Sequence, residues 1–392
     1  MGMWTQLDRG EVAEDFARIG EAGFDCVRIF LLWEDFQPEP DEVSAEHLDG
    51  LVAVADAARA ARLALMPTLF TGHMSGANWV PVWALDRSRS CGRFRTIARG
   101  RAVMAGIRNW YEDDGLVQAQ ARLVREAATA LSGYPALWAW DLGNEPSNCV
   151  LPPTAEHARK WLDTMIEALG ERSPGTPVTL GLHQQDIEEN RLLGPREAAG
   201  LLSFACMHGY PAYAAWSRHR ADDCVPVFLG LLTRWLSDQE VLFAELGAPT
   251  RREEQGDVDT LGLLEEHEAA AYTGRALEAL HRFGFLGALL WCFADYDPAL
   301  RDEPPFDEAP HEMSFGLWRS DGSEKPALKV VRDFEVRERT APRVDLGWID
   351  VTPEEYLSDP ARHLARLYAA FSAASAEPAT RGPAPLPSRR TR

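Results

Sequence analysis

Two glutamates of the sequence each stand where an apolar run ends. Glu145 follows the run 137–142 by three residues, and Glu245 directly follows the run 240–244. At the carboxyl ends of parallel strands such side chains point into one shared mouth. Two carboxyl groups about 5–5.5 Å apart can cleave a glycosidic bond in two displacements, one as acid and then base, the other as nucleophile on the anomeric carbon. We therefore expect Glu145 to be the acid/base and Glu245 the nucleophile.

The alternative for each glutamate is an exposed or helix-capping acid, which is the usual place of a lone glutamate. Two features of the sequence argue against it. Glu145 lies in the triplet Asn144-Glu145-Pro146 after an aromatic run, and Glu245 ends a second run 100 residues later. An asparagine beside the acid can also bind the 2-hydroxyl of a sugar. The constellation favours a site over two unrelated surface acids.

The elements that would position these residues follow an α/β pattern. Short apolar runs, apolar on both sides of the alternation as in buried parallel strands, alternate with amphipathic helical stretches. The predicted strands are 26–31, 63–70, 137–142, 177–182, 201–207, 240–244 and 287–293. The predicted helices are 12–22, 48–61, 116–131, 155–169 and 267–283. The pattern predicts a (β/α)8 TIM barrel.

The first strand of that barrel is short or missing from the sequence. Only residues 1–7 precede the first predicted helix, and they are too few and too polar for a clear strand. Either the natural chain begins upstream, with a strand and a signal peptide before Met1, or residues 3–7 form a degenerate strand. We favour the first explanation, because a gap would leave unpaired backbone on both neighbours. We expect residues 1–336 to form the catalytic barrel, 337–376 an appended segment with a helix, and 377–392 a disordered tail.

Further polar and aromatic residues follow the other runs in a fixed order. The matching residues are Arg28 on the second strand, His73 after the third, Asn144 and Glu145 after the fourth, His208 and Tyr210 on the sixth, Glu245 on the seventh and Trp291 on the eighth. In this order they resemble the retaining clan of (β/α)8 glycoside hydrolases, most closely the cellulase and β-mannanase family, glycoside hydrolase family 5. The resemblance covers about residues 11–326.

The resemblance implies a role for each of these side chains. Arg28 would keep Glu245 ionised, Tyr210 would donate a hydrogen bond to Glu245, and His208 would steady the same network. Trp291 would form the floor of the subsite where the bond is cut, and His73 and Asn144 would contact substrate. The alternatives are a structural ion pair for Arg28, a core histidine for His208, and barrel core for Trp291.

Tryptophan is frequent, with 13 residues, and sugar rings stack on its face. Trp33, after the second predicted strand, and Trp79, after the third, are therefore candidate sugar platforms. The alternative for both is packing that anchors their loops.

Composition excludes several other functions. The net charge of −20 argues against nucleic acid and against an anionic membrane as partners. The six cysteines form no C-x-x-C pair, and the chain has neither a His-Glu-x-x-His motif nor a glycine-rich phosphate loop, so we expect no metal and no cofactor. We expect a cytoplasmic protein, or a secreted one if the N-terminus is truncated.

Together these features predict a retaining hydrolase of β-linked hexosides, such as mannan or glucan oligosaccharides. Two alternatives stay open. One is an exo-β-mannosidase or β-galactosidase of the same clan. The other is a non-catalytic carbohydrate-binding protein, which the missing first strand suggests.

Overall fold

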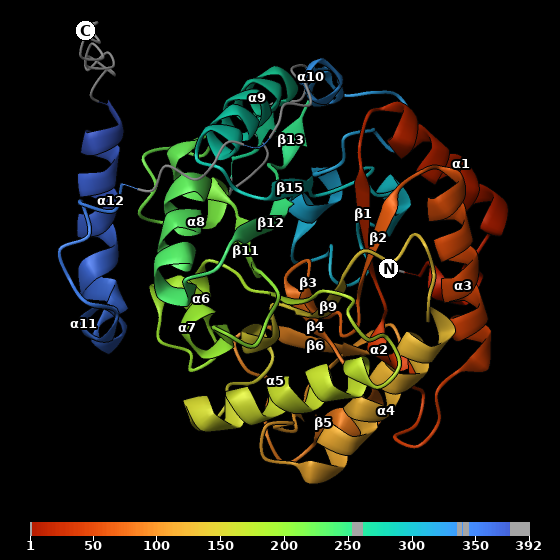
Figure 1. The fold of residues 1–392 in the computed structure, drawn as a ribbon. Coiled ribbons are helices and arrows are strands. Elements are labelled where there is room, and N and C mark those ends of the chain that lie inside the picture. Colours follow the sequence, from red (N-terminus) through yellow and green to blue (C-terminus); the bar gives the residue numbers. More distant parts are fainter. Residues whose placement is uncertain (1, 253–261, 335–338, 340–344, 377–392) are drawn as a thin grey trace, which may run out of the picture.

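Parallel strands form the centre of the fold. The computed structural model describes residues 2–252, 262–334, 339 and 345–376, and Figure 1 shows the strands surrounded by helices. One sheet has the order β1-β2-β9-β10 and a second has the order β11-β12-β15. Their bounds are β1 (Cys26–Phe30), β2 (Ala64–Thr68), β9 (Trp140–Asn144), β10 (Val178–Gly181), β11 (Ala205–Gly209), β12 (Val241–Leu246) and β15 (Gly287–Leu290). Each lies in or overlaps one predicted run, so the α/β prediction is confirmed.

The two sheets continue one another. Backbone bonds from Ser203 N–H to Val178 O, at 2.8 Å, and from His208 N–H to Leu182 O, at 2.9 Å, join the β10 region to the β11 region. On the other side, the ring of Trp291, after β15, lies 5.6 Å from that of Phe30 in β1. The seven parallel strands thus follow one another in chain order, and among the described residues no backbone ladder pairs β15 with β1, so closure into the predicted barrel stays a prediction.

The segment before the first long helix is not a strand. Residues Trp4–Gln6 form a 3-10 helix, so the less favoured explanation, a degenerate strand over residues 3–7, is wrong. The indole N–H of Trp4 donates to the carbonyl of Phe30 at 2.7 Å, and its ring packs edge-on against Phe36. This aromatic packing holds the segment beside the end of β1. The sequence gives little sign of it, because the residues next to Trp4 are mostly polar.

The helices that cover the strands begin at side-chain caps. Asp8, Ser44, Asp113 and Thr154 each accept a hydrogen bond from a backbone N–H of the first turn that follows. These helices are α1 (Arg9–Glu21), α3 (Ala45–Ala60), α4 (Asp114–Ala130) and α5 (Ala155–Gly170), and α9 (Glu266–Arg282) and α10 (Pro326–Asp333) follow later. All five predicted helices are confirmed.

Helix α8 (Cys224–Ser237) is absent from the prediction. Eleven of its 14 residues are buried, because helix α12 covers the face that would otherwise meet solvent. Residues 225–232 form a nearly continuous apolar run, and such a run does not by itself distinguish a buried helix from a strand. The sequence pattern therefore assigns no element to it.

The long connection after β2 forms a small second layer. Its strands β3 (Gly72–Met74), β4 (Ala77–Trp79), β6 (Arg95–Ala98) and β7 (Arg101–Val103) pair in the order β3-β4-β6-β7, and β5 (Leu85–Asp86) pairs with β8 (Gly106–Ile107). The remaining short elements are α2 (Trp33–Phe36), α6 (Gln185–Glu188), α7 (Pro195–Ala198), β13 (Thr250–Arg251) and β14 (Leu264–Glu265).

Two helices at the C-terminal end, α11 (Pro353–Ser358) and α12 (Pro360–Ala376), lie beside α6 and α8 (Figure 1). Tyr356 is fully buried and donates to the carbonyl of Ile187 at 2.7 Å, and Tyr368 packs its ring on Phe228. The predicted disordered tail, 377–392, lies outside the described residues. Within those residues, no helix has the length and apolar character needed to cross a membrane.

Candidate active site

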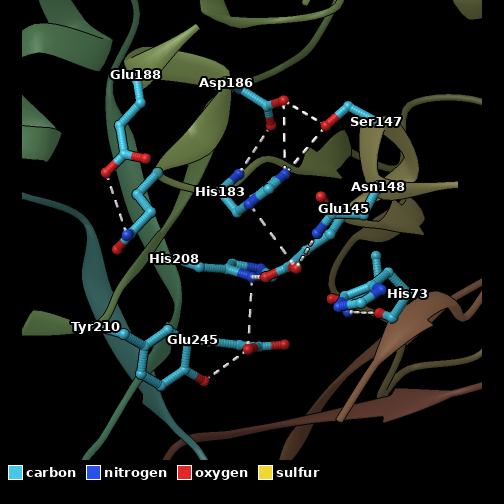
Figure 2. A network of polar contacts seen from close by, with 12 residues as sticks. His73, Glu145, Ser147, Asn148, His183, Asp186, Glu188, His208, Tyr210 and Glu245 are labelled. Carbon is cyan, nitrogen blue, oxygen red and sulfur yellow. Dashed lines mark hydrogen bonds and ion pairs between the residues drawn. The ribbon is translucent and has the colours of Figure 1, made fainter. Parts of the chain in front are cut away.

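The predicted site residues on the central strands meet at one place. Arg28 extends from β1, Glu145 follows β9, His208 lies on β11 and Glu245 on β12. Figure 2 shows Glu145, His208, Tyr210 and Glu245 converging on one another. One ligand atom from each of Glu145, His208 and Glu245 lies within 4.8 Å of the others. Carboxyl groups of a retaining pair are about 5–5.5 Å apart and those of an inverting pair about 6.5–9.5 Å.

The backbone at Glu145 turns the side chain into this cluster. Glu145 has φ 47° and ψ 48°, in the left-handed region that is unfavourable for a residue with a side chain. Its N–H donates to Gly181 O at 2.9 Å, and Pro146 starts the 3-10 helix Pro146–Asn148. Residues held in such conformations cluster at functional sites.

Arg28 joins three side chains of the site. Its guanidinium donates to Glu245 Oε1 at 2.8 Å, to Asn144 Oδ1 at 2.8 Å and to Asp141 Oδ2 at 2.6 Å. Asp141 is fully buried and also accepts hydrogen bonds from Thr68 and from two backbone N–H groups. The planar fork of arginine allows this simultaneous contact, which a lysine cannot reproduce.

His208 lies between the two glutamates. Its Nδ1 is 2.7 Å from Glu145 Oε1 and 3.4 Å from Glu245 Oε2. Burial lowers the pKa of His208 to about 4, so the ring is neutral at pH 7 and carries one proton. Its Nε2 is buried and has no hydrogen-bond partner in the described part of the chain. Since a buried N–H without an acceptor is costly, the proton belongs on Nδ1, where it faces both carboxyl groups.

Burial raises the pKa of both glutamates, but their polar neighbours differ. Glu245 receives the Arg28 guanidinium and the Tyr210 hydroxyl, the latter at 2.6 Å, and both favour its ionised form. Glu145 accepts from His208 and from Asn148 Nδ2 at 3.0 Å. Besides burial, nearby His73 and Arg28 lower the pKa of Glu145, and the negative charge of Glu312 raises it. Glu245 thus has a cation within hydrogen-bond distance, and Glu145 has none in the described part of the chain.

His73 and Trp291 lie next to this cluster. His73, on β3, is buried with its Nδ1 2.8 Å from Asn78 Oδ1, and the side-chain amide of Asn144 donates to its carbonyl. Its ring centroid is 4.2 Å from that of Phe94. Trp291 is partly exposed at the end of β15. Contacts of either side chain with a substrate stay a prediction.

Trp33 and Trp79 are both buried, which favours loop anchoring over the expected role as sugar platforms. Trp33 is 1% exposed, donates to Gln37 Oε1, and is surrounded by the rings of Phe70, Trp83 and Trp110. Trp79 is 5% exposed and donates to Met74 O at 3.0 Å. Both anchor the layer after β2, the packing alternative that the sequence left open.

Several polar residues of the site were not predicted. Asn148 and Asp141 lie within a few residues of Glu145, so their place near the β9 end was a usable signal. Glu312 carried no such signal. It lies in the 3-10 helix Pro310–Ser314, far from any predicted strand, and accepts from the hydroxyl of Tyr213 at 2.7 Å.

Among the described residues, Glu145, His208 and Glu245 are also the group whose atoms could hold a metal ion. Two features favour the hydrogen-bonded cluster over a metal site. Arg28 makes a buried ion pair with Glu245 at 2.8 Å, and this fixed positive charge repels a cation. The His208 contact accounts for the approach of the two carboxyl groups without a metal.

No protein-family model matches the chain, and no curated protein matches it. Solved structures do match. A GH5_18 protein of Streptomyces cattleya in complex with Manβ1-4GlcNAc gives a TM-score of 0.74 at 24% identity, over 95% of this chain and 86% of that one. A GH5_18 protein of Bifidobacterium longum subsp. infantis gives 0.69 at 21% identity, over 84% and 74%.

The exo-β-1,4-mannosidase of Opitutaceae bacterium strain TAV5 also matches, with a TM-score of 0.69 at 24% identity. The match covers 85% of this chain and 56% of that one. Likeness at these identities establishes the fold. Over most of its length the chain is a structural match to the GH5_18 glycoside hydrolases.

Proposed function

We propose that the protein is a retaining β-glycosidase that releases a β-linked mannosyl residue from a short oligosaccharide. Glu145 protonates the leaving oxygen while Glu245 attacks the anomeric carbon and forms a covalent glycosyl ester. Glu145 then removes a proton from water, which cleaves the ester with net retention. In this proposal residues 1–336 form a closed catalytic barrel, and 337–376 form an appended segment.

The observation that carries the proposal is the carboxyl pair. One oxygen from each of Glu145 and Glu245 lies within 4.8 Å of the other, which suits direct attack on carbon and leaves too little room for the water of an inverting enzyme. The contacts also divide the roles, because Arg28 and Tyr210 favour an ionised Glu245 and Glu145 has no cation within hydrogen-bond distance in the described part of the chain.

The choice of a β-mannoside draws support from the neighbouring structures. Two of them are bound to Manβ1-4GlcNAc, and a third is described as an exo-β-1,4-mannosidase. Because their identity to this chain is 20–24%, the sugar needs a direct test. The disaccharide Manβ1-4GlcNAc is the first substrate to examine.

The test is hydrolysis of aryl β-mannoside, β-glucoside and β-galactoside, of Manβ1-4GlcNAc, and of soluble mannan. We expect the aryl β-mannoside and the disaccharide to be cleaved fastest. Glu245→Ala should lower kcat/KM by about 10⁴-fold or more, as expected for loss of a nucleophile.

Glu240→Ala is the matched control. Glu240 is exposed and precedes the opposite end of the same strand, β12. It should leave hydrolysis unchanged. Equal rates for the wild type and Glu245→Ala would overturn the assignment, and binding of the sugars without any turnover would favour the non-catalytic alternative.

A further inference from the structure

A second polar group lies behind Glu145, on the side away from Glu245. It consists of Ser147, His183 and Asp186, and Figure 2 shows its contacts. Ser147 is in the 3-10 helix that follows Glu145, His183 follows β10, and Asp186 is in α6. All three side chains are buried. The inference below rests on the proposed role of Glu145 as the acid.

The hydrogen bonds of this group determine which nitrogen of His183 carries a proton. Ser147 donates its hydroxyl proton to Asp186 Oδ1 at 2.5 Å, and Asp186 Oδ2 accepts the backbone N–H of His183 at 3.0 Å. The Ser147 oxygen is then left as an acceptor, and His183 Nε2 lies 3.0 Å from it. Asp186 Oδ1 is a further 3.7 Å from Nε2. The ionised Asp186 thus favours the tautomer with its proton on Nε2.

The other nitrogen of His183 faces the acid. Nδ1 lies 3.9 Å from Glu145 Oε2, so a shift of about 1 Å would bring the pair to hydrogen-bond distance. Both oxygens of Glu145 accept a hydrogen bond, Oε1 from His208 Nδ1 at 2.7 Å and Oε2 from Asn148 Nδ2 at the longer distance of 3.0 Å. Oε2 therefore has the weaker donor, and it is the oxygen beside an imidazole nitrogen with a free lone pair, so we place the acidic proton of Glu145 on Oε2.

We propose that Ser147 and Asp186 hold His183 in the Nε2–H tautomer, so that its unprotonated Nδ1 faces Glu145 Oε2 and keeps Glu145 in its acid form. His183 is then a positioning residue that acts through Glu145. The reverse tautomer would present an N–H to Glu145 and stabilise the carboxylate instead.

Other charged and titratable groups also face Glu145. From the elements packed around it these are Arg28, His73, His208, Glu245 and Glu312. Arg191 faces the second group: it donates to Ser147 Oγ at 3.3 Å, and its charge lowers the pKa of both His183 and Asp186. Burial lowers the pKa of His183 well below its ordinary value, so the ring stays neutral. Burial raises the pKa of Asp186 to about 7. Above about pH 7 Asp186 is therefore ionised and favours the Nε2–H tautomer of His183. As the pH falls below about 7, Asp186 becomes protonated and this preference is lost.

The kinetic test is the alkaline limb of kcat/KM, which reports the loss of the acidic proton from the free enzyme. Asp186→Asn should move this limb to lower pH by about one pH unit, because His183 Nδ1 would then carry a proton and its N–H would stabilise the carboxylate of Glu145 instead of the acid. In a His183→Gln background Asp186→Asn should move the alkaline limb little, because the variant has no imidazole whose tautomer could change. Glu188→Gln, which removes a nearby acid bonded to Trp216, is the matched control and should leave the limb in place.

Equal shifts from Asp186→Asn in both backgrounds would overturn the proposal and assign the effect to charge alone. No shift in either background would overturn it too. If Asp186→Asn does not fold, Ser147→Ala carries the kinetic test without changing the charge: a limb displaced to lower pH supports the tautomer, and an unchanged limb refutes it.

A second readout needs no turnover and therefore separates this proposal from the proposed function. In protein labelled with ¹⁵N-histidine, at pH 8.5, the two ring nitrogens of His183 should show a protonated Nε2 and an unprotonated Nδ1. The His183→Gln variant assigns the signals. A protonated Nδ1 would contradict the proposal even if the enzyme proves inactive on every sugar.

Discussion

Asp222 and Glu145 are two enclosed carboxyl groups that the fold surrounds in different ways. Asp222 joins the loop before α8 to α12, and it accepts five hydrogen bonds: three from Arg218, one from the backbone of Cys224 and one from the hydroxyl of Tyr368. Glu145 accepts two, from Asn148 and His208, in the described part of the chain.

The pKa values of the two groups follow these donors. Burial alone would raise the pKa of Asp222, but the hydrogen bonds from Arg218 and Tyr368 lower it to about 2. Burial raises the pKa of Glu145, and its few donors do not reverse that. A carboxylate that only holds two segments together is supplied with donors, whereas one that must exchange a proton is left with few.

The largest effect should come from removing the titrating group. Glu145→Gln should lower kcat on Manβ1-4GlcNAc by about 10²–10⁴-fold, the usual contribution of general acid catalysis. The alkaline limb of the pH profile should disappear with it. An aryl mannoside with a highly acidic leaving group should lose much less in its first step, because that group departs without a proton. Equal losses on both substrates would argue against Glu145 as the acid.

Arg28→Lys should give the next largest effect. A lysine cannot contact Asp141, Asn144 and Glu245 together, so we expect kcat/KM to fall by about 10²-fold, or about 2.7 kcal/mol of transition-state stabilisation. The acid limb of the profile should move to higher pH, because Glu245 loses the guanidinium that favours its ionised form. Steady-state kinetics across pH measures both. An unmoved acid limb would show that Arg28 does not set the charge of Glu245.

Asp222→Asn should affect stability and leave the chemistry alone. We expect the free energy of unfolding to fall by about 2–3 kcal/mol, since donors of Arg218 and Tyr368 lose a charged acceptor. The native pKa of about 2 lies below the ordinary value, so in the wild type this stabilisation is present above about pH 4 and is lost as pH falls toward 2. Urea unfolding at pH 7 and pH 3 measures it. If Asp222→Asn shifted the alkaline limb of kcat/KM, Asp222 would influence the catalytic acid, and the contrast between a structural Asp222 and a proton-exchanging Glu145 would fail.

Tyr368→Phe should give the smallest effect. It removes one of the five donors to Asp222 and keeps the ring that packs on Phe228. We expect a loss of about 1.5 kcal/mol in unfolding free energy, the cost of a hydrogen bond to a charged group. A loss as large as that of Asp222→Asn would mean that Tyr368 alone carries the contact between α12 and the loop before α8.

The sequence was sufficient for the residues whose position depends on one strand. Arg28, Glu145, His208 and Glu245 each lie on or just after a strand of the central α/β unit, so the strand pattern and a general rule about strand ends were enough to bring them together. The same reasoning identified five helices, because each has one apolar face.

The remaining features depend on packing between distant segments. Glu312 and the contacts of Ser147 with His183 and Asp186 are set by the paths of loops, which no periodicity in the sequence encodes. Trp33 and Trp79 were assigned to sugar binding from residue type, but their burial is decided by the layer that folds over β2. Helix α8 was missed because its apolar run 225–232 reads equally as a buried strand or a buried helix.

The central claim is that Glu245 becomes covalently bound to the sugar, and trapping that species tests it most directly. The protein would be incubated with 2-deoxy-2-fluoro-β-mannosyl fluoride, digested with pepsin and analysed by mass spectrometry. We expect one fluoromannosyl adduct on the peptide that contains Glu245, and none in Glu245→Ala. An adduct on any other residue, or turnover of the wild type with inverted product and no adduct, would contradict the account.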